Sequence, residues 1–187
     1  MLGSLPLHLT PMKGGWMAGG AVRRWFTNAE KLSDVDYFFP NEVSFLDFKK
    51  FLITNGYKEE SSNPNVTTLL KGEITVQCIT IKYYETVEAL LESFDFNLCQ
   101  FAWDGKDIYS TPEAIISVGR NHLGVNKLEG NVMDSLRRAF KYCRKGFYPC
   151  NGTLMKIAES LRGLSEEDMK NSMEISPNGG KRIIRID

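Results

Sequence analysis

Two aspartates separated by a single residue are the side chains best placed to do chemistry in this 187-residue sequence. Asp34 and Asp36 begin a run, residues 34–39, that is rich in β-forming residues and is closed by Pro40. Because side chains along a strand alternate in direction, both carboxylates are expected on one face. Like charges held side by side repel each other unless a cation binds them, which suits Mg²⁺ or Mn²⁺. The alternative is a pair of carboxylates on a solvated face.

A glycine pair precedes the aspartates in the chain. Gly19-Gly20 follows a short apolar stretch and leads into a helix that is expected to reach about Asn28. Without side chains the backbone there can approach a triphosphate closely, and the first turn of the helix offers free N–H groups. Arg23 and Arg24 on that helix add positive charge. Beside a metal ion, such a phosphate cradle is suited to phosphoryl or nucleotidyl transfer. The alternative is that the glycines form an ordinary turn.

The elements that must position these residues are expected to form a mixed α/β domain. Asn41 caps a helix that ends at Asn55-Gly56, and its apolar positions are Val43, Leu46 and Phe51, with Phe48 and Leu52 beside them. The other expected elements are a hairpin of residues 66–70 and 74–83, a short helix from Thr86 to Leu91, a long strand over 94–103, a turn at Asp104-Gly105 followed by a strand to Tyr109, and a helix opened by Thr111-Pro112.

The pattern changes near residue 125, where helices replace strands. We expect an α/β domain over residues 1–125, a helical appendage over 126–176 and a tail over 177–187. Residues 1–119 carry ten basic and fifteen acidic side chains, whereas residues 120–187 carry thirteen and eight. An acidic part that can hold cations therefore adjoins a basic part that can hold phosphates. The expected helices of the second part are residues 131–145, residues 151–162 and one opened by the box Ser165-x-x-Asp168.

Composition argues against several other classes of protein. The sequence has no run of about 18 apolar residues, so no membrane partner is expected. Residues 1–10 lack the basic start of a signal peptide. None of the four cysteines forms a CxxC pair, and histidine is scarce, which disfavours a zinc site. We expect reduced thiols in a cytoplasmic protein.

Two stretches resemble a known family. Met17-Ala-Gly-Gly-Ala-Val-Arg23, followed by Ser33-Asp-Val-Asp-Tyr37, is similar to the signature of class II tRNA nucleotidyltransferases (CCA-adding enzymes) and bacterial poly(A) polymerases, of the DNA polymerase β superfamily. The resemblance implies a small mixed sheet flanked by helices. It also implies attack of an acceptor hydroxyl on the α-phosphate of a nucleoside triphosphate, with release of pyrophosphate. The acceptor is an RNA 3′ end, a protein side chain or a small molecule.

The second stretch, residues 136–147, is similar to the basic helix that follows the catalytic domain in that family. On this match Arg138 and Lys141 stand where the family has basic residues that face the nucleotide. From the residues alone, these side chains could equally be surface charge. The nucleotide-binding set that the resemblance implies is Gly19, Gly20, Arg23, Arg24, Ser33, Arg138 and Lys141.

The sequence departs from the family pattern at the third carboxylate. The family places it on the strand after the Asp-x-Asp strand, where this sequence has Gln77. Asp95, at the start of the next apolar run, is the candidate to replace it as a catalytic residue. The alternative is a polar residue at a strand edge. Three hypotheses remain. The first is a metal-dependent nucleotidyltransferase that uses Asp34, Asp36 and Asp95, and the second is a catalytically impaired protein that binds a nucleotide or a partner as a regulator. The third is an unrelated α/β domain in which these motifs are coincidence.

Overall fold

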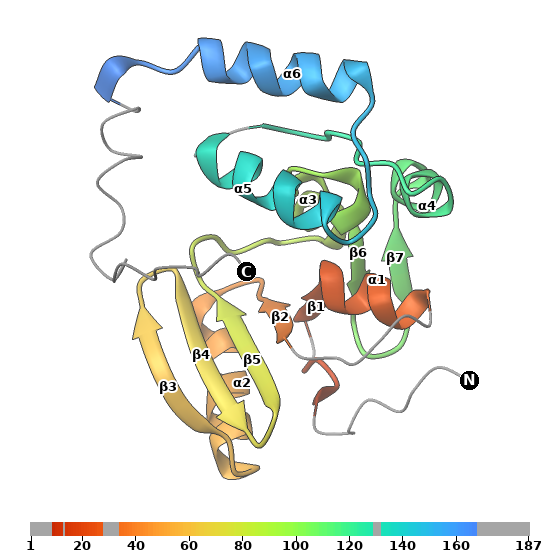
Figure 1. Ribbon diagram of the computed structural model, residues 1–187. Helices are drawn as coiled ribbons and strands as arrows, with labels where there is room; N and C mark the ends of the chain where they lie inside the picture. The colour runs from red at the N-terminus through yellow and green to blue at the C-terminus, as the bar shows by residue number, and fades with distance from the viewer. Residues whose placement is uncertain (1–8, 13, 28–33, 129–131, 168–187) are drawn as a thin grey trace, which may run out of the picture.

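A computed structural model describes residues 9–12, 14–27, 34–128 and 132–167. Within these ranges the chain forms a seven-stranded mixed sheet with the strand order β3-β4-β5-β2-β1-β6-β7 (Figure 1). The fold class is α/β, as expected. The strands are β1 (Trp16–Ala18), β2 (Asp34–Phe38), β3 (Lys58–Asn63), β4 (Val66–Lys71), β5 (Ile74–Ile79), β6 (Phe101–Trp103) and β7 (Ile108–Ser110), and the helices are α1 (Gly20–Phe26), α2 (Glu42–Thr54), α3 (Val87–Glu92), α4 (Pro112–Gly119), α5 (Val132–Cys143) and α6 (Asn151–Arg162).

Strand β2 lies near the middle of the sheet between two different kinds of neighbour. It pairs antiparallel with β1, which places Ala18 opposite Asp36. It pairs parallel with β5, which places Asp36 beside Gln77. The glycine pair begins directly after β1. The sheet therefore brings the C-terminal end of β1 next to the N-terminal halves of β2 and β5.

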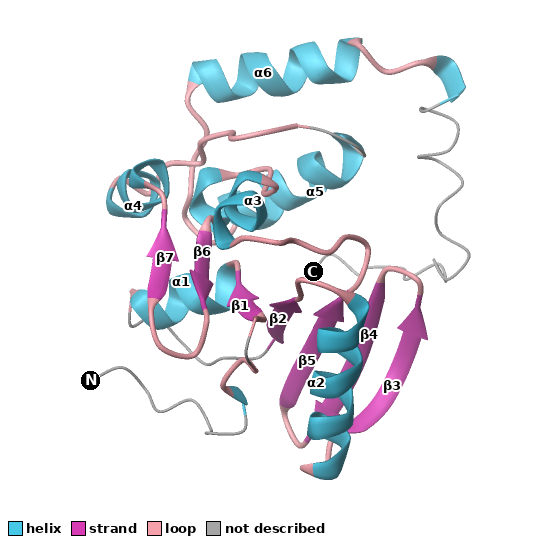
Figure 2. Cartoon of the chain, turned by 180° about the vertical axis from the view of Figure 1, so that it is seen from behind, coloured by secondary structure: helices cyan, strands magenta, loops and turns pink. Residues whose placement is uncertain are grey.

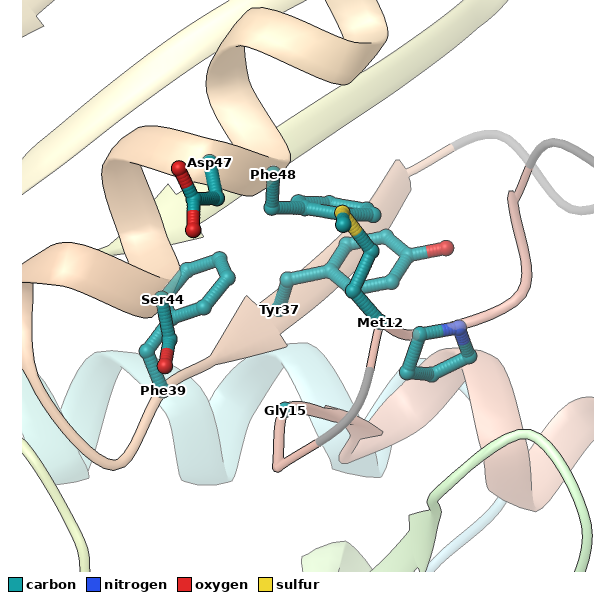
Figure 3. A pocket seen from close by; sticks show the side chains of 8 residues that line it. Met12, Gly15, Tyr37, Phe39, Ser44, Asp47 and Phe48 are labelled. Carbon is teal, nitrogen blue, oxygen red and sulfur yellow. The ribbon is translucent and has the colours of Figure 1, made fainter.

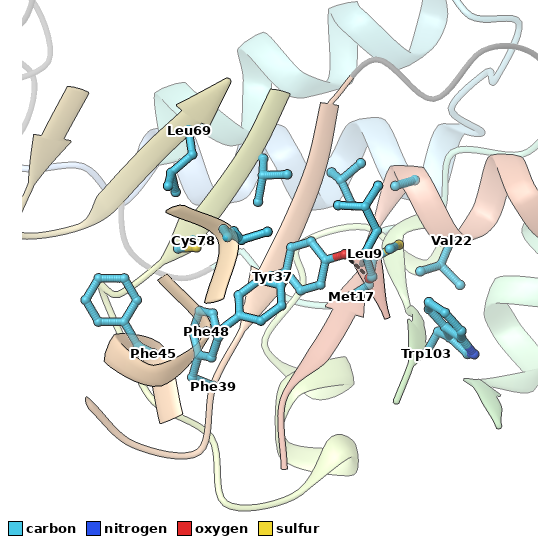
Figure 4. Close-up of a cluster of buried hydrophobic side chains, with 14 of the residues drawn as sticks. Leu9, Met17, Val22, Tyr37, Phe39, Phe45, Phe48, Leu69, Cys78 and Trp103 are labelled. Atoms are coloured by element: carbon cyan, nitrogen blue, oxygen red, sulfur yellow. Dashed lines mark hydrogen bonds between the residues drawn. The ribbon is translucent and has the colours of Figure 1, made fainter. Parts of the chain in front are cut away.

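The core of the sheet domain fixes the direction of the aspartates. Val35 and Tyr37 are fully buried, and the ring of Tyr37 packs at 4.5 Å from that of Phe48 on α2 (Figure 4). Because alternate residues of a strand face opposite ways, Asp34 and Asp36 point to the face of the sheet that α2 does not cover. The prediction of a shared face for the two carboxylates is confirmed.

Helix α2 packs across β4 and β5 (Figure 2), and the sheet selects one of its two apolar sides. Its start is as predicted, because the Asn41 side chain accepts a hydrogen bond from the Ser44 amide. The buried positions, however, are Phe45, Phe48 and Leu52. Val43 and Leu46, expected among the apolar positions, lie on the opposite side of the helix and are exposed by 67% and 51%. Phe48 and Leu52, expected beside them, are the ones that are buried.

One strand of the sheet was not expected, and one expected strand is wrong. β3 was not expected, because its sequence, Lys-Glu-Glu-Ser-Ser-Asn, is polar throughout and all six residues are exposed. The long strand expected over residues 94–103 is broken, because residues 97–99 form a 3₁₀ turn and only Phe101–Trp103 enters the sheet. Phe96 forms an isolated bridge to Val125 instead. The hairpin prediction is confirmed, with its second strand ending at Ile79.

Helices α5 and α6 follow the sheet domain, and α5 lies between the sheet and α6 (Figure 1). A separate apolar cluster joins them to the segment around the 3₁₀ turn. The box Ser165-x-x-Asp168 reaches past the described residues, and the tail 177–187 lies outside them. No helix in the described ranges has the length and apolar character needed to cross a membrane. The buried members of the cluster are Phe96, Leu98, Cys99, Leu123, Ala139, Tyr142 and Ile157.

Candidate active site

Two adjoining cavities lie where α1, β2 and α5 meet in the described part of the chain. The large cavity has a volume of about 640 Å³ and the small cavity about 160 Å³. They share Gly20, Asp36, Lys141 and Tyr142, so they open into one region. The remaining residues of the small cavity are Ala21, Arg23, Arg24, Asp34, Gln77 and Lys145. The large cavity is also lined by Gly19, Phe38, Ile81, Lys82, Tyr84, Ser93, Phe94, Asp95, Cys99, Lys127 and Arg138.

Asp34 and Asp36 line the small cavity together. Burial, and then the negative charge of Asp34, raise the pKa of Asp36 from its ordinary 3.8 to about 6. Lys141 and Arg24 act in the opposite direction on this pKa. The carboxylates are therefore close enough to repel each other, as the sequence analysis predicts, and positive side chains surround them.

This donor set fits a hard divalent cation. Two carboxylates on one face supply oxygen ligands, and Mg²⁺ needs only one or two from the protein when a substrate supplies phosphate oxygens. No group of three or more His, Cys, Asp or Glu side chains in the described residues is arranged to hold a metal ion. Gln77 lies beside Asp36 on the neighbouring strand and lines the same cavity, so a neutral amide stands next to the carboxylate pair.

Asp95 belongs to the large cavity, and it does not line the small one with Asp34. It precedes the 3₁₀ turn instead of opening a long strand. Its Oδ2 accepts a hydrogen bond from Nε of Arg138 at 2.6 Å, and the side chain is only 11% exposed. The structure thus places Asp95 in an ion pair with α5 and does not bring it into the carboxylate pair.

The glycine pair forms the border between β1 and α1. Gly19 has a φ of 77°, a conformation that side chains with a Cβ rarely adopt. Its amide donates a hydrogen bond to the Phe101 carbonyl at 2.8 Å, which fixes the turn to β6. Both glycines line the large cavity, and a Cβ on Gly20 would lie 3.3 Å from a guanidinium nitrogen of Arg24. The glycines therefore keep the backbone bare beside Asp36.

Arg23, on α1, is almost completely buried against α5 and the turn that follows it. It is 4% exposed, and its guanidinium carbon lies 5.6 Å from the ring centre of Tyr142 and 4.8 Å from that of Phe147. Burial lowers the pKa of Arg23. Among the described residues its buried Nη1 atom has no hydrogen-bond partner. A buried donor without an acceptor is costly, so this nitrogen is suited to receive an anion.

The other expected basic residues divide between the cavities. Arg24 lines the small cavity, donates from Nη2 to the Asp34 carbonyl at 3.3 Å, and has no described partner for its buried Nε. Lys141 is exposed and lines both cavities. Arg138 lines only the large cavity. Ser33 lies outside the described residues.

Sequence reasoning missed Lys145 as a site residue. It follows α5 in a turn that Gly146 closes with a φ of 85°, and it lines the small cavity. Burial, followed by the charges of Lys141, Arg24 and Arg23, lowers the pKa of Lys145. The basic run after Asp134 contains Lys145, but helix spacing alone does not show that the turn brings it back toward Asp34.

A third cavity, of about 180 Å³, lies on the α2 side of the sheet (Figure 3). It is lined by Met12, Tyr37, Phe39 and Phe48, with the carboxylate of Asp47 and the hydroxyl of Ser44 at its edge. No basic side chain lines it among the described residues. This cavity is therefore less suited to a triphosphate than the two cavities that Arg24 and Lys141 line.

Comparison with known proteins identifies the family. A sequence model described as "Gad2: Gabija anti-defense 2 family protein" matches residues 5–120. The chain belongs to the Gabija anti-defense 2 family. The curated family protein "Gabija anti-defense 2" of Bacillus phage SPbetaL7 is 25% identical over 162 residues, which are 84% of this chain and 40% of that protein. The chain thus spans less than half the length of this Gabija anti-defense 2 relative.

Solved structures similar to this Gabija anti-defense 2 family member are tRNA nucleotidyltransferases. A CCA-adding enzyme with CTP superposes with a TM-score of 0.64 at 17% identity, over 83% of this chain and 42% of that one. A tRNA nucleotidyltransferase with a primer tRNA and an ATP analogue gives 0.61 at 16%, over 79% and 46%. The Thermotoga maritima CCA-adding enzyme gives 0.60 at 16%, over 84% and 39%. The nucleotidyltransferase fold is confirmed, and the family that the sequence comparison shows is Gabija anti-defense 2.

Proposed function

We propose that this Gabija anti-defense 2 family member is a Mg²⁺- or Mn²⁺-dependent nucleotidyltransferase. One observation carries the proposal: Asp34 and Asp36 share a cavity with Arg23 and Arg24, and each arginine has a buried guanidinium nitrogen that lacks a hydrogen-bond partner among the described residues. A pair of acids suited to a divalent cation thus lies beside donors suited to phosphate oxygens. The nucleotidyltransferase fold and the structural neighbours with CTP and an ATP analogue support it.

In this proposal the nucleoside occupies the large cavity, whose volume of about 640 Å³ lies in the range of small-molecule sites. The bare backbone of Gly19 and Gly20 lets the triphosphate approach Asp36. Asp34 and Asp36 would hold the divalent cation, which would supply Lewis-acid stabilisation of negative charge on the reacting phosphate. The acceptor oxygen bonds to the α-phosphorus, the bond to the bridging oxygen breaks, and pyrophosphate leaves.

The acceptor is an RNA 3′ end, a protein side chain or a small molecule. Structural neighbours that act on tRNA support the RNA end. The name of the phage relative supports a role in which the transfer protects a phage from a host defence. The match covers only 40% of the relative's length. The anti-defence role and the choice of acceptor are therefore proposed for the whole protein.

A second candidate is a nucleotide-binding regulator without transferase activity. Gln77 favours it, because a neutral amide stands beside Asp36 where a third acid would complete a metal-binding set. Such a protein binds a triphosphate and releases no pyrophosphate.

The test is incubation of the purified protein with each α-³²P-labelled nucleoside triphosphate, Mg²⁺ or Mn²⁺, and RNA or protein acceptors. Pyrophosphate release and label transfer are measured for the native chain and for Asp34→Asn/Asp36→Asn. Asp47→Asn is the matched control, because Asp47 is an exposed carboxylate on α2 outside both site cavities. We expect transfer by the native chain and the control only. Binding without transfer would favour the regulator, and transfer that survives the double substitution would refute the roles of the aspartates.

A further inference from the structure

The small cavity gathers more positive charge than the carboxylate pair needs. Arg23 and Arg24 reach it from α1, and Lys141 and Lys145 reach it from α5 and the turn after it. Like charges gathered in one cavity repel each other. Burial, and then the charges of the neighbouring cations, lower the pKa of Lys145. With a divalent cation on the aspartates the excess grows. The cavity is therefore built for a ligand with several negative charges.

The buried guanidinium of Arg23 shows where that ligand must reach. Its flat faces lie near the rings of Tyr142 and Phe147, which satisfy no N–H donor. Nη1 of Arg23 and Nε of Arg24 are buried, and neither has an acceptor among the described residues. Phosphate oxygens accept several hydrogen bonds from such planar donors at once. An anion that reaches these nitrogens from the small cavity would satisfy both.

The size of the small cavity limits what the anion can be. Its volume of about 160 Å³ is below the usual range for whole small-molecule ligands, about 300–1,000 Å³. It joins the large cavity at Asp36, Lys141 and Tyr142. A chain of phosphate groups that runs from the large cavity into the small one fits this shape, and a nucleoside does not fit the small cavity.

We propose, on the basis of the proposed nucleotidyltransferase function, that the small cavity binds the β- and γ-phosphates of the donor, and that Lys145 is a substrate-binding residue for them. The bound polyphosphate then contacts α1 through Arg23 and Arg24 and α5 through Lys141 and Lys145. It joins the sheet domain to the helical part across their interface. Its binding therefore rigidifies α5 as well as neutralising charge.

The test measures binding of inorganic tripolyphosphate and of ATP to the purified full chain by titration calorimetry. Lys145→Gln is compared with Arg144→Gln, since Arg144 is exposed, adjacent and outside both cavities. We expect Lys145→Gln to weaken both ligands on the order of tenfold or more, because a hydrogen bond to a charged group is lost. Lys145→Arg should restore most of the affinity, and Arg144→Gln should match the native chain.

Hydrogen exchange gives a second readout that is independent of the affinity measurement. Tripolyphosphate should slow amide exchange in Val132–Cys143 of the native chain, and the slowing should weaken in Lys145→Gln. Native-like binding by Lys145→Gln would overturn the role of Lys145 while leaving the nucleotidyltransferase proposal intact. Failure of the native chain to bind ATP or tripolyphosphate, with or without Mg²⁺, would overturn both. Binding without any change of exchange in α5 would overturn the link between the two parts.

Discussion

Replacement of Asp36 by asparagine should stabilise the metal-free protein at neutral pH. The pKa of Asp36 rises from 3.8 to about 6 in the folded chain, so its ionised form is less favourable there than in the unfolded chain. The shift is about two pH units, and each unit corresponds to about 1.4 kcal/mol, which gives a penalty of about 3 kcal/mol. The penalty is present above pH 6 and is relieved as pH falls toward 3.8. Asp36→Asn removes the ionisable group and with it the penalty.

The assay is urea unfolding of native chain and Asp36→Asn at pH 7.5 and pH 4.5, in EDTA and in Mg²⁺. In EDTA at pH 7.5 the variant should gain up to about 3 kcal/mol in free energy of unfolding, and most of that gain should disappear at pH 4.5. Mg²⁺ should stabilise the native chain and have little effect on the variant. Asp47→Asn, at an exposed position, should change neither value by more than about 0.5 kcal/mol.

One result would refute this reasoning. If Asp36→Asn is less stable than the native chain in EDTA at pH 7.5, the ionised carboxylate is stabilised by its surroundings in the folded state. The positive side chains around it would then outweigh burial and the charge of Asp34, and the carboxylate pair would not need a cation.

Three further substitutions test other parts of the site. Gly19→Ala should cost about 1–3 kcal/mol of unfolding free energy in calorimetric melting, because the φ of 77° at this position is unfavourable for a residue with a Cβ. The control is Gly119→Ala at the end of α4, where no atom lies near the added Cβ, and it should be neutral or stabilising. Arg23→Met should keep the packing against Tyr142 and change the free energy of unfolding by no more than about 1 kcal/mol, yet weaken ATP binding on the order of tenfold. An ATP affinity equal to that of the native chain would contradict the anion role of Arg23. Gln77→Glu should tighten Mg²⁺ binding and lower the free energy of unfolding in EDTA, because it adds a third acid beside Asp36. Unchanged Mg²⁺ affinity in a calorimetric titration would show that this position does not face the metal.

The sequence predicted the parts of the fold that depend on local chemistry. The N-caps at Asn41, Thr86 and Thr111 all form, because each side chain accepts a hydrogen bond from a backbone amide three residues later. The alternation of Asp34 and Asp36 with buried residues needs only the two-residue period of a strand. These features could be read from neighbouring residues without knowing what they pack against.

The missed parts depend on contacts far along the chain. β3 has no apolar pattern, and it is a strand because it pairs with β4 at the edge of the sheet. The apolar run around Phe96 predicted a strand, but Asn97 donates its amide to the Gly124 carbonyl and the chain turns there. Apolar residues on both sides of α2 left its buried face undecided, and the sheet selected Phe45 and Phe48.

The candidate site shows the same division. Spacing predicted that Asp34 and Asp36 share a face, and the family resemblance placed Gln77 on the neighbouring strand; the burial pattern and the register agree with both. It did not predict the ion pair of Asp95 with Arg138, because the two residues are 43 positions apart. Nor did it predict Lys145 in the small cavity, because that requires the turn after α5 to close against α1.

The position of Tyr142 limits how the site can evolve. Its side chain lines both cavities, its ring packs at 5.8 Å from that of Phe96, and its hydroxyl lies 3.0 Å from the Cys99 sulfur. Arg23 lies over the same ring. A mutation that changes this side chain to alter substrate preference also disturbs the packing that holds α5 in place. Adaptive change in this protein should therefore accumulate at the exposed margins of the cavities, while the tyrosine at their junction tolerates few replacements.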